Sequence, residues 1–216
     1  MKKLFIDSDQ KHSNQQNKSE GEFDFFICGF PSKVVKPSSI IRSLRSGDYT
    51  TIPSGNYSFY ASDEKFIYAL SAEASFRKLY YSSCMGKLLV SDDFWKISLE
   101  LSQKQKNINA QALLETVFCG SPLSHDTWHD GIKVLTPGSF LKFNKFTREL
   151  EIFYLDLPKY EENILANRHL IFEQLDEAFN NAATSAIEIS EGKPLYISVS
   201  GGFDSRVALS YLSQRQ

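Results

Sequence analysis

The residues best suited to chemistry lie between positions 194 and 212. A short apolar run at residues 195–199 predicts a buried strand of the kind found in parallel sheets. It leads directly into the segment SGGFDS at residues 200–205, and apolar residues with helical spacing follow at residues 207–212. The sequence therefore predicts a strand, a tight glycine turn and the start of a helix, in this order.

Such a turn is suited to binding an anion. Gly201 and Gly202 would let a phosphate approach the main chain closely, and the N–H groups at a helix start favour negative charge. Ser200 and Ser205 can add hydroxyl donors, whereas Asp204 would repel a bare phosphate unless a divalent cation bridged the two. This pattern indicates Mg²⁺. The alternative interpretation is a glycine-rich turn in an unrelated α/β protein.

The elements that must position this turn fall into three predicted segments. Residues 1–22 are expected to form a mobile polar leader, because residues 8–22 contain no apolar side chain that could offset the entropy of ordering. Residues 23–156 show strand patterns separated by turn residues, which predicts a mostly antiparallel domain. Residues 157–216 first show a helical period, which Gly192 and Pro194 end. The predicted fold class is α+β, an antiparallel sandwich followed by the start of a parallel α/β domain.

Within residues 23–156 the local signals are specific enough to give boundaries. One helix is expected from Pro37 through Leu44, and another between an Asn109 cap and Gly120. Strands are expected at residues 23–30, 57–61, 66–70, 79–81, 88–91, 140–143 and 150–154.

Composition excludes several classes of function. The chain has 24 Lys and Arg against 26 Asp and Glu and no basic block, so neither nucleic acid nor a membrane surface is an expected partner. No apolar stretch approaches the length of a membrane span. Cys28, Cys84 and Cys119 form no CxxC pair, which fits a reducing, cytoplasmic location. A homodimer is compatible with the sequence but is not specified by it.

The sequence does not favour a zinc site at its one histidine pair. His125 and His129 are four residues apart with Asp126 and Asp130 beside them, a spacing that could bind zinc on a helix. Gly131 predicts a loop there instead, and no third ligand has suitable spacing.

The SGGFDS segment resembles the SGGxDS loop of the ATP-pyrophosphatase superfamily, and specifically its asparagine-synthetase branch. In that family the loop holds the pyrophosphate of ATP while a carboxylate is adenylated. The resemblance implies ATP and Mg²⁺ as cofactors, with Asp204 helping to hold Mg²⁺. The cofactor-binding residues that it implies are Ser198, Ser200, Gly201, Gly202, Asp204 and Ser205.

The resemblance extends upstream. Residues 112–143 are similar to the segment that closes the glutaminase domain of asparagine synthetases, with a "P...T...GI..L.PG" pattern. Tyr154 and Asp156 resemble that family's YWD, and residues 55–81 resemble its hairpin and following "kPLYY". Together these matches cover most of residues 55–212 and imply that residues 23–156 form an Ntn-hydrolase-like sandwich.

The family's glutaminase residues are missing from this sequence. Lys2 stands where the family has a nucleophilic cysteine after the initiator methionine, and a free amine beside that thiol serves as the base. Cys28 lies inside a predicted strand and cannot supply a terminal amine. Ser71 and Ala72 replace the family's Arg-Asp pair, and residues 29–31 replace its Asn-Gly-Glu turn. No catalytic residue is therefore assigned, and glutamine hydrolysis is expected to be absent.

The resemblance implies an ATP-dependent amide-forming ligase that acts on a small-molecule or peptide carboxylate, as in asparagine biosynthesis. Loss of the glutaminase fits a lasso-peptide cyclase or a β-lactam-synthetase-like ligase better. Few residues follow the loop, whereas a complete nucleotide-binding sheet needs further strands, so the chain is expected to be a fragment or truncation that is inactive alone. The remaining hypothesis is a non-catalytic remnant that acts as an interaction module.

Overall fold

The computed structural model divides the chain into two compact units. The first unit comprises Met1–Pro31 and Val35–Leu157, and the second comprises Ser32–Val34 and Pro158–Gln216. The structure describes residues 5–7, 18–20, 23–32, 36–84, 86–101, 107–155, 168–190 and 192–214. Within these residues, no helix combines the length and the apolarity needed to cross a membrane.

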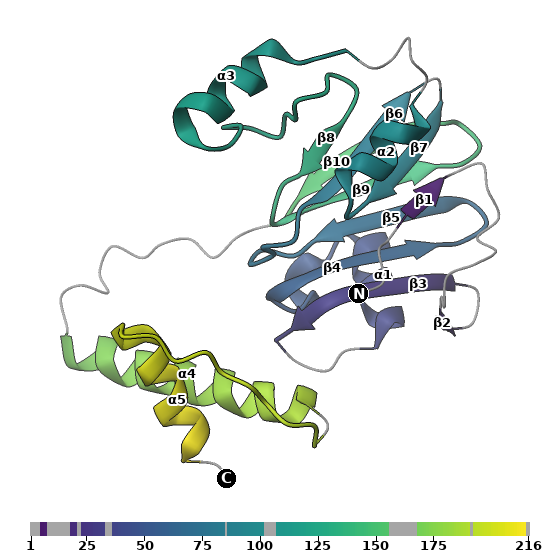
Figure 1. Ribbon diagram of the computed structural model, residues 1–216. Helices are drawn as coiled ribbons and strands as arrows, with labels where there is room; N and C mark the ends of the chain where they lie inside the picture. The colour runs from purple at the N-terminus through teal and green to yellow at the C-terminus, as the bar shows by residue number, and fades with distance from the viewer. Residues whose placement is uncertain are drawn as a thin grey trace. The chain divides into compact units, whose positions relative to one another are not determined.

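The larger sheet of the first unit has six antiparallel strands in the order β10-β9-β5-β4-β3-β2 (Figure 1). Its central hairpin pairs Phe59 with Leu70 and Tyr60 with Ala69, so successive side chains alternate between the two faces. The five strands expected here from the sequence are confirmed. The strands are β2 (Lys18–Glu20), β3 (Phe23–Pro31), β4 (Gly55–Ser62), β5 (Phe66–Ser71), β9 (Ser139–Asn144) and β10 (Leu150–Tyr154).

The smaller sheet has four antiparallel strands in the order β1-β7-β6-β8. Its β6–β7 hairpin pairs Tyr81 with Val90, as the strand patterns predict. The strands are β1 (Phe5–Asp7), β6 (Leu79–Cys84), β7 (Lys87–Ser91) and β8 (Lys133–Leu135).

The two sheets stack on each other, which confirms the predicted antiparallel sandwich. One apolar cluster contains Tyr60, Ile67 and Leu141 from the larger sheet together with Leu79 and Val90 from the smaller one. Because side chains of both sheets share this cluster, it is the core between them.

Helices cover the outer faces of the sandwich. Helix α1 (Pro37–Ser46) packs Ile40 and Leu44 against Phe59, on the face of β4 opposite to Tyr60. Helix α2 (Phe94–Glu100) packs Ile97 against Leu89 of the smaller sheet. The first unit is therefore layered as helix, sheet, sheet and helix. A short 3-10 helix, η1 (Tyr49–Thr51), follows α1.

Helix α3 (Ala110–Cys119) begins and ends where the sequence predicts. The Asn109 side chain accepts a hydrogen bond from the Ala112 N–H at 3.1 Å, and Gly120 ends the helix in the left-handed conformation at φ 81°. Its apolar side chains differ from those of α1, because Leu114, Val117 and Phe118 are exposed.

The second unit contains two described helices, α4 (Arg168–Ser190) and α5 (Phe203–Ser213). Phe179 of α4 stacks on Tyr211 of α5 with ring centroids 5.3 Å apart. The Tyr211 hydroxyl donates to Asp176 Oδ1 at 2.5 Å, and this bond raises the pKa of Tyr211. The predicted helix up to Gly192 is confirmed.

The strand predicted at residues 195–199 is wrong. These residues form no strand, and Leu195, Tyr196 and Val199 are exposed. A strand of a parallel sheet needs neighbours for its main-chain hydrogen bonds, and the described part of the second unit contains no other strand. The parallel α/β part of the predicted fold class is therefore not formed in these residues.

The structure also differs from the predicted polar leader at two places. Phe5–Asp7 forms β1 beside β7, and Lys18–Glu20 forms β2 beside β3. Main-chain hydrogen bonds to a neighbouring strand can order a segment such as Lys18–Glu20 without any apolar residue, a possibility that a prediction based on side chains alone does not include. The rest of residues 1–22 lies outside the described residues.

Candidate functional site

The sequence-predicted loop forms a tight turn at the start of α5. The Ser200 N–H donates to Ser205 Oγ at 3.0 Å, and the Gly202 N–H donates to Ser200 Oγ at 3.2 Å. The hydroxyl oxygens of Ser200 and Ser205 lie 3.2 Å apart. The two serines at the ends of the motif are thus brought together around the two glycines.

The helix start itself is uncapped. Gly202 is the N-cap residue and has no side chain, so the N–H groups of the first turn receive no side-chain cap bond from it. Asp204 lies in this turn, where a carboxylate is favoured by the positive end of the helix dipole. The site therefore presents main-chain donors, two hydroxyls and one carboxylate.

Gly201 leaves open space at the turn. A Cβ at this position would meet no atom within 4 Å, and the backbone is not in the left-handed region that favours glycine. A Cβ at Gly202 would contact Ser200 Oγ at 3.4 Å. Neither the backbone conformation nor a neighbour within the chain thus requires glycine at position 201.

Arg206 belongs to the site, although the sequence interpretation did not include it. Its Nε donates to the Gly202 carbonyl at 3.2 Å and a terminal nitrogen donates to the Gly201 carbonyl at 2.8 Å. The guanidinium also lies over the Phe203 ring, 4.9 Å from its centroid. The signal was available in the sequence, because an arginine in the first turn of a helix is within reach of the carbonyls before it.

One predicted cofactor-binding residue, Ser198, is not part of the turn. Ser198 is exposed and lies in the irregular segment before the turn, with no described hydrogen bond to the loop. Lys2 lies outside the described residues. Ser200, Gly201, Gly202, Asp204 and Ser205 are therefore the predicted residues that the turn brings together.

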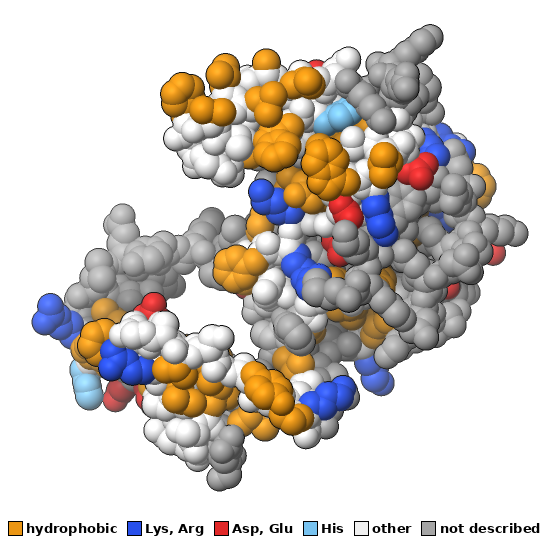
Figure 2. Space-filling model, viewed as in Figure 1, with side chains coloured by type: hydrophobic (Ala, Val, Ile, Leu, Met, Phe, Trp, Pro, Cys, Tyr) orange, Lys and Arg blue, Asp and Glu red, His pale blue; other side chains and the backbone are white. Residues whose placement is uncertain are grey.

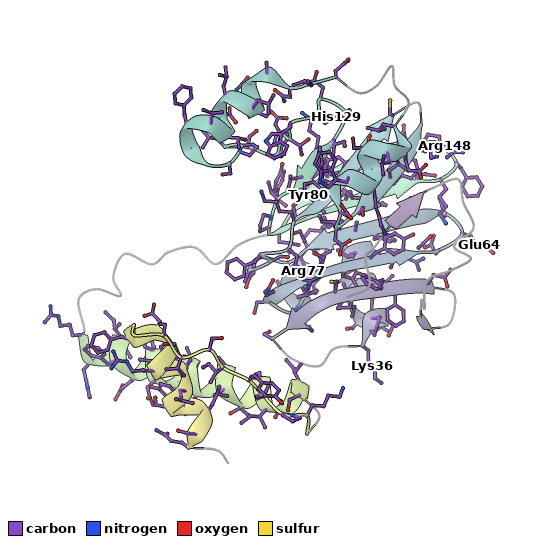
Figure 3. All side chains as sticks on the ribbon, in the orientation of Figure 1. Lys36, Glu64, Arg77, Tyr80, His129 and Arg148 are labelled. Atoms are coloured by element: carbon purple, nitrogen blue, oxygen red, sulfur yellow. The ribbon has the colours of Figure 1, made fainter. Side chains whose placement is uncertain are left out.

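The first unit has a row of small polar side chains where the resemblance implied a glutaminase site. Cys28 pairs with Ser58, Ser58 with Ser71, and Ser71 with Ser139 across four neighbouring strands, so all four share one face of the sheet. Arg77, labelled in Figure 3, donates to Cys28 Sγ at 2.9 Å. This places Cys28 inside β3, as predicted.

The two residues that the resemblance aligns with an Arg-Asp pair carry no charge. Ser71 and Ala72 are both 1% exposed, and the hydroxyls of Ser58 and Ser71 are buried without a hydrogen-bond partner in the described structure. Buried hydroxyls in this state are typical positions for an ordered water. The row thus offers no charged side chain at positions 71 and 72 to pair with an amino-acid ligand.

The two histidines considered for zinc lie in a loop, as the sequence predicts. His129, labelled in Figure 3, accepts from the Gly131 N–H through Nδ1 at 3.1 Å. The Lys133 ammonium hydrogen-bonds the Asp126 carboxylate and lowers the pKa of Asp126. Across the described residues, no group of three or more His, Cys, Asp or Glu side chains could hold a metal ion.

No protein-family model matches the chain, and no curated protein is similar to it. Its structural neighbours are glutamine amidotransferases. One is the glutamine phosphoribosylpyrophosphate amidotransferase from B. subtilis complexed with ADP and GMP, at 11% identity and a TM-score of 0.36. That match covers 72% of this chain and 32% of the amidotransferase.

Two further solved structures are similar to the same degree. A glutamine aminotransferase class-II domain protein from Silicibacter pomeroyi matches at 9% identity and a TM-score of 0.38, over 67% of this chain and 72% of its own. An allosteric regulatory enzyme of purine biosynthesis matches at 10% identity and a TM-score of 0.34, over 63% of this chain and 29% of its own. The chain thus spans about a third of the length of two of these neighbours. Similarity at this level establishes no activity.

Proposed function

We propose that the chain carries the pyrophosphate-binding loop of an ATP-dependent amide-forming ligase of the asparagine-synthetase type. The observation that supports the proposal is the uncapped start of α5, which follows a glycine turn with open space at Gly201. Main-chain N–H groups at such a position are a ready site for phosphate oxygens. The sequence resemblance of SGGFDS to the family loop supplies the identity of the anion.

The residues of the turn fit a pyrophosphate group. The N–H groups of the first turn of α5 would donate to its oxygens, and the hydroxyls of Ser200 and Ser205 lie at the same turn. Asp204 would hold Mg²⁺ together with the phosphate oxygens, because Mg²⁺ is commonly bound through one or two carboxylates plus substrate phosphates. Arg206 would keep the Gly201 and Gly202 carbonyls engaged, so that fewer free carbonyl dipoles oppose the anion.

When bound, ATP supplies an α-phosphate that a substrate carboxylate attacks, so that the carboxylate becomes activated toward an amine. The chain's own part in this reaction is to bind and orient the leaving pyrophosphate through the turn at residues 200–205. The substrate would be a small-molecule or peptide carboxylate. The cysteines at positions 28, 84 and 119 form no disulfide, which suits the reducing cytoplasm in which we place the protein.

Among ligases of this type, one that takes its amine from the substrate fits better than one that hydrolyses glutamine. The supporting observation is that Ser71 and Ala72 are buried and uncharged at the positions of the family's Arg-Asp pair. A peptide-cyclising or β-lactam-forming ligase meets this condition. Incubation of the full chain with glutamine should therefore release no glutamate, and measurable release would reject the substrate-amine alternative.

A titration of the full chain with magnesium pyrophosphate tests the proposal directly. Backbone NMR signals of residues 200–205 should shift in a saturable way at millimolar ligand. Gly201→Val fills the open space, and Ser205→Ala removes the hydroxyl that accepts from the Ser200 N–H, so each should weaken binding about tenfold.

Ser210→Ala is the matched control for the serine variant. Ser210 lies on the same helix, and its hydroxyl donates to the Val207 carbonyl at 2.8 Å, away from the turn. The affinity of the Ser210→Ala variant for pyrophosphate should equal that of the unmodified chain. Absence of any shift in residues 200–205, or an equal loss in Ser210→Ala, would favour the non-catalytic remnant instead.

A further inference from the structure

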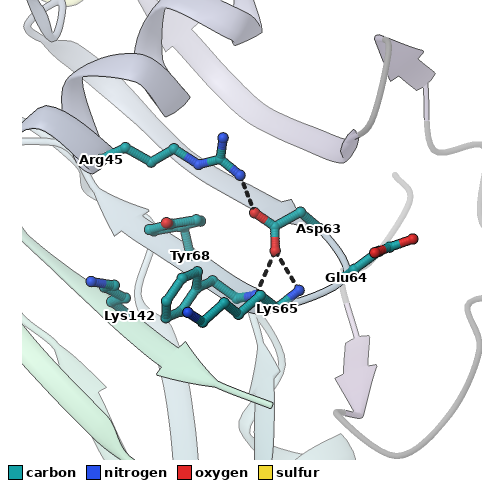
Figure 4. Close-up of a pocket in the computed structure, with 7 residues that line it drawn as sticks. Arg45, Asp63, Glu64, Lys65, Tyr68 and Lys142 are labelled. Carbon is teal, nitrogen blue, oxygen red and sulfur yellow. Dashed lines mark hydrogen bonds and ion pairs between the residues drawn. The ribbon is translucent and has the colours of Figure 1, made fainter. Parts of the chain in front are cut away.

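The first unit contains a charged cavity that is separate in sequence from the loop at residues 200–205. The cavity has a volume of about 520 Å³ and lies at the turn between β4 and β5 (Figure 4). This volume is within the range of about 300–1,000 Å³ that is usual for small-molecule sites. The residues that line it are Arg45, Asp63, Glu64, Lys65, Phe66, Tyr68 and Lys142.

Both oxygens of the Asp63 carboxylate already have partners within the chain. One oxygen forms an ion pair with Arg45 of α1, and the other accepts from the N–H groups of Lys65 at 2.7 Å and Phe66 at 2.5 Å. The Asp63 side chain is 8% exposed. Asp63 therefore does not neutralise the lysines of the cavity. Glu64, the other acidic residue of the turn, points away from Tyr68 and Lys142 in Figure 4.

Two lysine ammonium groups share one aromatic neighbour. Lys142 Nζ lies 4.7 Å and Lys65 Nζ lies 5.1 Å from the centroid of the Phe66 ring. Lys65 forms no ion pair within the described residues, and Lys142 forms an ion pair with the exposed Glu151 at 3.8 Å. A long, exposed pair of this kind contributes little. Two positive charges thus flank one aromatic ring, and neither has a strong ion-pair partner within the described residues.

We propose that this cavity binds a small organic dianion, with Lys65 and Lys142 supplying the charge and Phe66 and Tyr68 contacting an apolar part of the ligand. A ligand with two negative charges can pair with both ammonium groups, whereas a monoanion can pair fully with only one. Lysine binds phosphate as a point charge, and carboxylates form similar charge-assisted hydrogen bonds. The chemical class is therefore a phosphate monoester or a dicarboxylate.

Calorimetric titration of the full chain tests this proposal, with phenyl phosphate, succinate and benzoate as probes. Phenyl phosphate or succinate should bind saturably, and the monoanion benzoate should bind at least tenfold more weakly than the better of the two. Tighter binding of phenyl phosphate identifies a phosphate monoester as the ligand class, and tighter binding of succinate identifies a dicarboxylate. Equal binding of all three probes, or no binding of either dianion, would overturn the proposal.

Substitutions of individual side chains test whether the dianion binds in this cavity. Lys65→Gln combined with Lys142→Gln should reduce dianion affinity at least tenfold while the circular dichroism spectrum stays unchanged. Lys36→Gln is the matched control, because Lys36 is exposed at the start of α1 and does not line the cavity (Figure 3). Gly201→Val should leave the affinity unchanged, which separates this site from the proposed pyrophosphate loop. An equal loss in Lys36→Gln, or a loss in Gly201→Val, would place binding elsewhere and reject the cavity.

Discussion

The two units of the chain differ in how far their apolar side chains are buried. In the first unit, large side chains such as Tyr57, Phe59 and Phe140 are at most 1% exposed. In the described part of the second unit, Ala183 alone is buried. Phe172 is 68% exposed and Tyr196 is 93% exposed, and Figure 2 shows hydrophobic side chains at the surface of this unit.

This difference separates helix formation from burial. Helices α4 and α5 form where the sequence predicts, because their periodicity and flanking residues are local signals. Burial of their apolar side chains needs a second layer, and a helix in an α/β domain normally finds that layer in a sheet. The described residues of the second unit provide no strand. The two helices instead contact each other through the stacked rings of Phe179 and Tyr211.

The largest expected effect comes from truncating one phenylalanine in each unit. Phe140 is fully buried, stacks on Phe153 with centroids 4.8 Å apart and meets Tyr49 edge-on at 5.1 Å. Phe140→Ala should lower the free energy of unfolding by about 3–5 kcal/mol, because it leaves a cavity in the core. Phe172→Ala should change it by less than about 0.5 kcal/mol, because the side chain is mostly exposed.

Urea unfolding followed by circular dichroism and by tryptophan fluorescence measures both variants. Both tryptophans, Trp95 and Trp128, lie in the first unit, so fluorescence reports on that unit. A loss of several kcal/mol in Phe172→Ala would show that the second unit has a core in solution, and the contrast between the units would be wrong.

A smaller effect is expected from two glycines of the first unit that share a positive φ. Gly29 in β3 has φ 107°, and a Cβ there would lie 2.2 Å from the Asn56 carbonyl oxygen. Gly47 after α1 has φ 78°, and a Cβ there would meet nothing within 4 Å. Gly29→Ala should therefore cost about 2–4 kcal/mol, since strain and overlap add, whereas Gly47→Ala should cost about 1 kcal/mol from strain alone.

Thermal unfolding of the two glycine variants gives this comparison directly. Equal costs would mean that β3 and β4 move apart to accept the added methyl group, and the close approach of their backbones at Gly29 would have no energetic importance.

The predictions from the sequence succeed where the signal is local. The β4–β5 hairpin, α1 and α3 follow from alternation, a proline at the first turn and an asparagine cap, all of which act over a few residues. Helix α2 was not predicted, although its start carries such a signal, because the Asp93 side chain accepts from the Trp95 N–H at 3.1 Å. Strand β8 (Lys133–Leu135) was missed for another reason, since so short a strand depends on its partner β6.

The two candidate sites differ in the same respect, because one rests on local sequence signals and the other does not. The turn at residues 200–205 could be predicted because its residues are consecutive in the sequence. The cavity around Phe66 could not, because Arg45, Lys65 and Lys142 come from three segments that only the sheet topology brings together. The strand at residues 195–199 was predicted wrongly for a related reason, since its apolar run is local but its hydrogen-bond partners are not.

The smallest effect concerns how the helices of the two units begin. Helix α3 has a side-chain cap, in which Asn109 Oδ1 accepts from the Ala112 N–H, whereas α5 begins at Gly202 without one. Asn109→Ala should destabilise α3 by about 1 kcal/mol. Gln111→Ala is the control within the same helix, because it removes only an exposed bond to Glu115 and should change the stability by less than about 0.5 kcal/mol.

Hydrogen exchange of the α3 amides measures this loss even if α3 opens without global unfolding, because local opening contributes to exchange. Protection factors should fall about fivefold in Asn109→Ala and stay unchanged in Gln111→Ala, since a tenfold change would need about 1.4 kcal/mol. If exchange at the start of α5 is as slow as at the capped start of α3, then a side-chain cap is not what distinguishes the two helix starts. The N–H groups of α5 would then not be free for an anion, and the proposed pyrophosphate loop would lose its main physical support.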